Sequence, residues 1–175
     1  MTKLFIVTSL AIVTAGILQA QTSPAGAPTD PQIAMIVVTA DNVDIAGGKL
    51  AAKKSSNPKV KEFAELMVRD HTSVNNQATQ LAKKLNVTPE ESPTSKSLKA
   101  DGAATLSKLR KLTGAEFDKA YIDNEVTYHE TVIKALDDTL IPNAKNAELK
   151  ALLETGKPIF ESHLNHAKEL QTSLK

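Results

Sequence analysis

The sequence of 175 residues contains no cysteine and no tryptophan. Without cysteine there is no disulfide, no thiol nucleophile and no lipid-bearing N-terminal cysteine, so stability must come from core packing. The aromatic residues are only four Phe and two Tyr, too few for a platform on which nucleic-acid bases stack. The formal net charge is only +1, and the lysines are interleaved with acidic residues instead of forming a basic stripe. We therefore expect no nucleic-acid partner.

Known catalytic motifs are missing as well. The chain has no glycine-rich phosphate loop, no Gly-x-Ser-x-Gly elbow and no His-Glu-x-x-His pair. A hydrolase built on a lone serine would need a nearby base and an orienting acid, which spacing alone cannot establish. The sequence therefore assigns no known enzyme activity.

Residues 1–20 have the pattern of a secretory signal peptide. Lys3 supplies the positive start, residues 4–18 form a mostly apolar stretch, and Ala20 is a small residue at the cleavage point. This stretch is shorter than the roughly 20 residues that span a bilayer, so a retained membrane anchor is the weaker alternative. We expect a mature chain that begins near Gln21, has no stable membrane span and is periplasmic or secreted.

The remaining chain is predicted to be all helical, since it shows no alternating strand pattern. Residues 21–29 are small, polar and proline-containing, which predicts a disordered lead-in, and residues 30–175 form one domain. Its predicted long helices cover about residues 30–54, 58–85, 113–141 and 143–172.

Helix-start signals support these limits. Asp30 is the expected cap before Pro31, and Thr113 with Glu116 has the form of a capping box. Gly156 and Pro158 are expected to kink the last helix.

The segment 86–112 is the expected crossover, and a weaker helical pattern occupies residues 96–110. Two antiparallel hairpins of long helices, joined by a long crossover that contains a short helix, form the plan of a ferritin-like four-helix bundle. This is the predicted fold class.

Three of the four histidines interrupt apolar lines of three different helices. His71 follows residues spaced alternately by four and three, which places it on a core-facing side, and His129 and His163 lie on similar lines. All three fall near mid-helix, so their rings are expected to meet at one height inside the bundle. Asp44 would be the fourth side chain of this layer, although Val43 heads an equally apolar neighbouring line.

Several segments together resemble a known family. They are Asp44 to Leu50, Phe63 to His71, Phe117-Asp118 with His129, and Pro158 with His163, Leu164 and Ala167. The sequence resembles the secreted bacterial domain-of-unknown-function 4142 family over about Pro31 to Leu170. The resemblance implies a ferritin-like fold with acidic and histidine positions that match Asp44, His71, His129 and His163, and it implies no activity. The Glu-x-x-His pairs of di-iron ferritins are absent, since Glu125 and His129 are four residues apart.

Imidazole is a suitable ligand for zinc, copper or iron, and a carboxylate adds charge compensation in a buried site. The predicted ligands are His71, His129 and His163 with Asp44, and Glu125 would replace or supplement Asp44. The implied cofactor is a transition metal ion (Zn, Cu or Fe), bound singly or as a pair, with a role in metal handling or the stress response. Asp70, Tyr128 and His166 are candidates to orient these ligands.

The alternative is a metal-free network of histidines and carboxylates that sets helix register in a scaffold or interaction module, which binds another protein or a second copy. His163 and His166 could instead form a surface pair. Gly47 and Gly48 could permit close helix approach, although a weakened helix is the commoner meaning. If the imidazoles are buried and neutral, acidification toward about pH 5 should destabilise the fold.

Overall fold

The computed structural model describes residues 26–174; the predicted signal peptide and most of the lead-in lie outside the described residues. Within this range the chain is helical and contains no strand, which confirms the all-helical prediction. The long helices are α1 (Asp30–Lys54), α2 (Pro58–Lys84), α3 (Pro93–Lys111), α4 (Gly114–Ala135) and α6 (Ala147–Ser173). No helix in the described range is both long enough and apolar enough to cross a bilayer.

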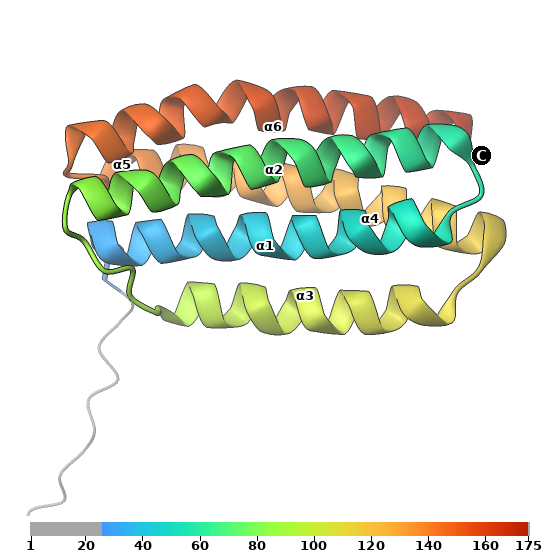
Figure 1. Cartoon of the computed structure of the whole chain (residues 1–175), viewed down its shortest axis with the longest axis horizontal. Coiled ribbons are helices and arrows are strands. Elements are labelled where there is room, and N and C mark those ends of the chain that lie inside the picture. Colours follow the sequence, from blue (N-terminus) through green and yellow to red (C-terminus); the bar gives the residue numbers. More distant parts are fainter. Residues whose placement is uncertain (1–25, 175) are drawn as a thin grey trace, which may run out of the picture.

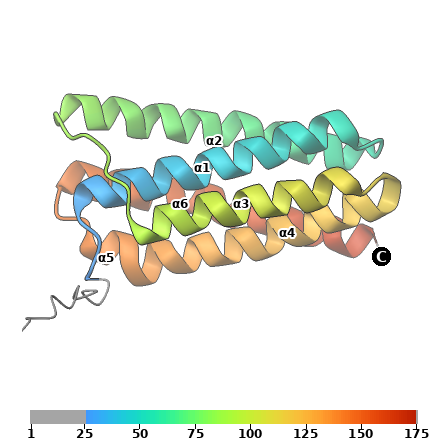
Figure 2. The ribbon, with the colours of Figure 1, turned by 90° about the horizontal axis from the view of Figure 1, so that it is seen from below.

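The helices lie side by side with their long axes roughly aligned (Figure 1). α1 and α2 run in opposite directions and pack together, and α4 and α6 form a second antiparallel pair. α6 also contacts α2, while α3 packs mainly on α1, on the outside of the other helices (Figure 2). α3 has 19 residues and runs along most of α1, so the crossover helix is longer than the predicted 96–110.

Asp30 does not cap its own helix as predicted. The N-cap of α1 is Thr29, whose backbone N–H donates to Gln32 Oε1 at 3.1 Å. The Asp30 carboxylate instead accepts the backbone N–H groups of Lys145 and Asn146, at 2.8 Å each. Asp30 therefore fixes the chain just before α6, a connection between distant segments that local sequence cannot indicate.

The predicted capping box of Thr113 and Glu116 is also wrong. Thr113 is the N-cap of α4, but its side chain makes no capping hydrogen bond. Gly114, the first helical residue, has a φ of +56°, a left-handed conformation that glycine adopts without steric cost. A capping box requires a regular first helical turn, and the left-handed Gly114 is not compatible with such a turn.

α4 continues beyond Ala135 through a π-helical turn, η1 (Leu136–Leu140), and a short helix, α5 (Ile141–Asn143). In η1 the backbone N–H of Ile141 bonds to Leu136 O, five residues earlier. The sequence predicted that this helix ends at about residue 141, because Pro142 has no N–H to donate to a helical hydrogen bond. The helical conformation instead continues through Pro142 to Asn143. α6 likewise remains helical through Pro158.

The core consists of two apolar halves separated by a polar layer. One half includes Phe63, Met67, Phe117, Ile122 and Leu170, and the other includes Ile33, Val74, Leu140, Leu153 and Phe160. The buried polar side chains between them are Asp41, Asp44, His71, Glu125, His129 and His163. Helices α1, α2, α4 and α6 thus place charged and polar groups at one level of the core.

Candidate metal centre

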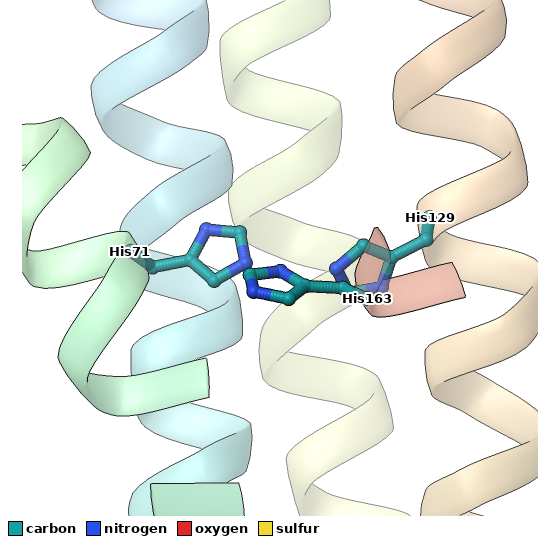
Figure 3. A group of neighbouring side chains, drawn as sticks. All are labelled: His71, His129 and His163. Atoms are coloured by element: carbon teal, nitrogen blue, oxygen red, sulfur yellow. The ribbon is translucent and has the colours of Figure 1, made fainter. Parts of the chain in front are cut away.

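Three imidazole rings from three helices meet in the polar layer. His71 of α2, His129 of α4 and His163 of α6 are at most 2% exposed and point toward one another (Figure 3). Their ring centroids are 5.7 Å (His71–His129), 5.3 Å (His71–His163) and 5.5 Å (His129–His163) apart. One nitrogen from each ring lies within 4.8 Å of the other two. The convergence expected from the helical lines is therefore present.

Each ring is held on one nitrogen by an oxygen acceptor. His71 Nδ1 lies 2.9 Å from Asp41 Oδ1, His129 Nδ1 lies 2.9 Å from the backbone oxygen of Glu125, and His163 Nε2 lies 3.1 Å from Asp70 Oδ2. A carbonyl or carboxylate oxygen can only accept, so these nitrogens carry the hydrogens. The hydrogen bonds fix the ring orientations.

The opposite nitrogen of each ring is left without a hydrogen bond. His71 Nε2, His129 Nε2 and His163 Nδ1 are buried and have no hydrogen-bond partner within residues 26–174. An unpaired buried polar atom costs free energy, and a well-packed core rarely contains several together. A histidine that binds a metal ion usually donates the N–H of one ring nitrogen to a protein oxygen and coordinates the ion through the other nitrogen. The three rings have this arrangement.

Two buried carboxylates lie beside the rings of His71 and His129. Asp44 Oδ2 lies 2.8 Å from His71 Nε2 and 3.5 Å from His129 Nε2, and Glu125 Oε2 lies 3.7 Å from His129 Nδ1. At 2.8 Å, Asp44 Oδ2 is close enough to accept a hydrogen from His71 Nε2 when the His71 ring is protonated. A second group of close ligand atoms therefore comprises Asp44, Glu125 and His129, which belongs to both groups.

The charge of the layer is unevenly distributed. Burial opposes protonation of His71, but the carboxylates of Asp44 and Asp41 outweigh it and raise its pKa to about 10. Burial likewise opposes ionisation of Asp44, yet the neighbouring His71 lowers its pKa to about 2. His71 and Asp44 therefore form a buried ion pair at neutral pH. The condition of a buried neutral imidazole, on which the predicted acid destabilisation depends, does not hold for His71.

The pKa values of Glu125, His129 and His163 are shifted toward their neutral forms. Burial, reinforced by the negative charge of Asp44, raises the pKa of Glu125 well above its usual range, so this side chain holds a proton. Burial lowers the pKa of His129. Burial also lowers the pKa of His163 to about 4, although its hydrogen bond to Asp70 acts in the opposite direction. These two rings are neutral bases at neutral pH.

The sequence left open whether the line of Asp44 or that of Val43 on α1 faces the histidines, and the packing of the two side chains decides this. Asp44 is 2% exposed and faces the histidines, while the side chain of Val43 lies against Gly102 of α3. Gly48 permits close helix approach, because an added Cβ would lie 2.8 Å from the backbone oxygen of Ala64. The commoner interpretation, a merely weakened helix, is wrong at this position.

The residues expected to orient the ligands divide into two sets. Asp70 bonds His163, and Tyr128 Oη donates to the backbone oxygen of Ala40 at 2.8 Å, beside the polar layer. His166 instead packs edge-on against Phe63, with ring centroids 5.2 Å apart, so it neither orients a ligand nor pairs with His163 at the surface.

Sequence reasoning missed two members of the layer. Asp41 is 1% exposed and bonds His71; its position three residues before Asp44 was the available signal. Tyr121 is 0% exposed with its hydroxyl unpartnered in the described chain, and it lies one turn before Glu125. An added Cβ at Gly47 would lie 3.8 Å from the Tyr121 ring. Tyr121 carried no such signal, because an aromatic on a helix face is usually apolar core.

Fold and site define an all-helical domain that encloses a layer of histidine and carboxylate side chains. The model of the family described as "Domain of unknown function (DUF4142)" matches residues 16–170, and the chain belongs to this family. The resemblance of the sequence to this family is thus confirmed. Searches of curated proteins and of solved structures gave no match.

Proposed function

We propose that this protein binds a single transition metal ion through His71, His129, His163 and Asp44. The observation that carries the proposal is the pattern of nitrogens in the three rings. Each ring is bonded to a protein oxygen on one nitrogen and directs its other buried nitrogen toward the other two rings. The second nitrogens of His129 and His163 have no hydrogen-bond partner in the described chain, and that of His71 faces Asp44 Oδ2 at 2.8 Å. Three such nitrogens with a neighbouring carboxylate form a ligand set suited to zinc, copper or iron.

One ion fits these residues better than a pair. The two groups of ligand atoms share His129, whose Nδ1 bonds to the backbone oxygen of Glu125, so only Nε2 remains to bind a metal. Glu125 would then complete the coordination or hold the charge balance beside Asp44. Two carboxylates match the charge of a divalent cation, which is costly to bury without compensation.

The arrangement of helices supports a ferritin-like bundle as the wider class. α1–α2 and α4–α6 are antiparallel pairs, the connection between them carries α3 along the outside, and all four paired helices contribute to the polar layer. Ferritin-like proteins place metal ligands on facing helices of such a bundle. The ligand set of this chain nevertheless differs from two Glu-x-x-His pairs.

The expected location of this function is outside the cytoplasm. The signal-peptide pattern of residues 1–20 supports export, with cleavage near Ala20. An exported protein with one enclosed metal site and no known catalytic motif suits metal handling or the stress response.

Elemental analysis after purification without chelator tests the proposal. We expect about one metal ion per chain, which both His71→Ala and His163→Ala lose. The matched control is His166→Ala, because this fourth histidine packs on Phe63 away from the layer and should leave the metal content unchanged. Wild-type protein that stays metal-free after incubation with zinc, copper and iron, with unchanged thermal stability, would contradict the proposal.

A metal-free scaffold is the second candidate, and a different observation favours it. His71 is held between Asp41 and Asp44, at 2.9 Å and 2.8 Å, which gives the ring charged partners without any ion. A network of this kind fixes helix register. This candidate predicts full stability without metal and no gain on adding it, so the elemental analysis and the melting experiment separate the two.

A further inference from the structure

Positive side chains gather at one end of the bundle, although the sequence interleaves them with acidic residues. The last turns of α1, α3 and α6 and the first turns of α2 and α4 lie together at this end (Figure 1). Seven of its side chains are exposed or half-buried and form no ion pair among residues 26–174: Lys49, Lys53, Lys59, Lys61, Lys108, Arg110 and Lys111. We call these seven residues the basic end.

The fold brings the members of the basic end close together. α1 packs on α3, and Lys54 Nζ donates to the backbone oxygen of Arg110, so the last turns of these two helices adjoin. The loop of residues 55–57 leads from there directly into α2. The exposed acidic residues of the adjoining turns are fewer and form no ion pair with the basic end; they are Glu62, Glu65, Glu116 and Glu169. Positive charge therefore prevails at this end.

Six lysines outside the basic end are held in ion pairs instead. They are Lys84, Lys96, Lys119, Lys134, Lys157 and Lys168, and each contacts an aspartate or glutamate. The concentration of unpaired cations is therefore a property of one end and not of the whole surface.

Helix stability explains only part of this charge. Cations in the last turns of α1 and α3 interact favourably with the negative ends of the helix dipoles. Lys59 and Lys61 lie instead among the first four residues of α2, where the dipole is positive and the first turn contains no acidic residue. Both cations are unfavourable in the isolated fold, and a negatively charged partner would offset this cost.

We infer that the basic end docks on the surface of a bilayer rich in anionic phospholipids. Each lysine or arginine near such a surface strengthens binding by about fivefold. The seven cations are spread over the ends of three helices that stop side by side, so they match a flat, extended negative surface (Figure 1). Nucleic acid is disfavoured as the partner, because the Phe117 ring at this end is 0% exposed and offers no platform for base stacking.

Membrane docking and metal binding involve separate parts of the molecule. Lys53 lies about 14 Å from Asp44 along the axis of α1, at a rise of about 1.5 Å per residue. No member of the basic end belongs to the buried polar layer. The inference therefore goes beyond the proposed metal site, and its failure would leave the elemental analysis unaffected.

Sedimentation of the exported protein with sucrose-loaded vesicles tests the inference. We expect binding to vesicles of phosphatidylcholine and phosphatidylglycerol in equal parts, and at least about tenfold weaker binding to pure phosphatidylcholine. Raising NaCl from about 0.05 M to about 0.5 M should release the protein, because salt screens exposed charges. Inorganic phosphate at the concentration of the phosphatidylglycerol should leave it bound, since an isolated anion engages few of the cations.

Three results of this experiment would overturn the inference. They are no binding to the mixed vesicles at low salt, equal binding to both kinds of vesicle, and release by inorganic phosphate. Tighter binding to duplex DNA than to the mixed vesicles, compared per phosphate group, would overturn it as well, because the surface would then select a nucleic acid.

Two charge-reversing double variants locate the binding. Lys53→Glu with Lys111→Glu should weaken binding to the mixed vesicles at least about 25-fold, because the basic end loses two cations. Lys83→Glu with Lys99→Glu makes the same change of net charge at exposed, unpaired lysines outside the basic end, and it should leave the affinity within about threefold. Equal losses in the two variants would overturn the inference, because binding would then follow total charge.

A third double variant separates docking from folding. Lys59→Gln with Lys61→Gln removes cations from the positive end of the α2 dipole, so its melting temperature should equal or exceed that of the wild type. Its binding to the mixed vesicles should nevertheless weaken about 25-fold. Circular dichroism and thermal melting establish that the variant is folded, and wild-type affinity for the vesicles in this folded variant would also overturn the inference.

Discussion

Metal binding at the histidine layer should release protons and strengthen steeply with pH. His71 must present an unprotonated Nε2 to the ion, yet its carboxylate partners raise its pKa to about 10. A pH of 7 lies about three units below this pKa. Removing the proton from His71 at pH 7 therefore costs about 4 kcal/mol, which is about a thousandfold in metal affinity. The pKa of Glu125 is also raised, so its carboxylate must release a second proton before it can act as a ligand.

The magnitude follows from the number of competing protons. Loss of one proton gives a tenfold gain in affinity for each pH unit below the pKa of His71, so the Kd for zinc should fall by at least about 100-fold between pH 6.5 and 8.5. Ionisation of Glu125 would make the dependence steeper. The unprotonated His163, with a pKa of about 4, adds nothing over this range.

Two measurements check this prediction. Competition with a chelator of known protonation behaviour gives the Kd at each pH, and calorimetry in buffers of different ionisation enthalpy counts one to two protons released per ion. His166→Ala should show the wild-type slope, because this ring lies away from the layer. An affinity that stays constant between pH 6.5 and 8.5, without proton release, would refute the argument that His71 is protonated in the metal-free protein and must lose that proton to bind the ion.

Three further predictions concern stability. Gly48→Ala should lower the free energy of unfolding by about 1–3 kcal/mol in urea titrations, because its Cβ would lie 2.8 Å from a backbone oxygen; Gly47→Ala, with its nearest atom at 3.7 Å, should cost nothing. The free energy of unfolding of the metal-free protein should fall by up to about 3 kcal/mol as the pH falls from 6.5 to 4. The reason is that the pKa of His163 is about 4 in the folded protein, so this ring takes up a proton more readily in the unfolded chain. An equal loss in a His163→Gln variant would contradict this prediction. Asp30→Ala should cost about 1–2 kcal/mol by thermal melting, since its carboxylate accepts two backbone N–H groups at 2.8 Å; an unchanged melting temperature would show that water replaces it.

The sequence by itself determined the helical elements and the core positions of the histidines. Helical periodicity placed His71, His129 and His163 among apolar residues, and proline and cap residues placed most helix ends within a few residues of the observed ones. These signals are local, because they depend on side chains three or four residues apart on one helix. The family resemblance likewise rested on short segments and holds for residues 16–170.

Only the tertiary structure decided which face of α1 meets the histidines and how protons are shared in the layer. α3 packs against Val43, which turns Asp41 and Asp44 toward His71, and a helix with two apolar lines cannot reveal this alone. The pKa of His71 rises and those of His129 and His163 fall because the three rings differ in their distance from the same carboxylates. Burial and charge separation depend on contacts between helices far apart in the chain, and sequence spacing carries no measure of either.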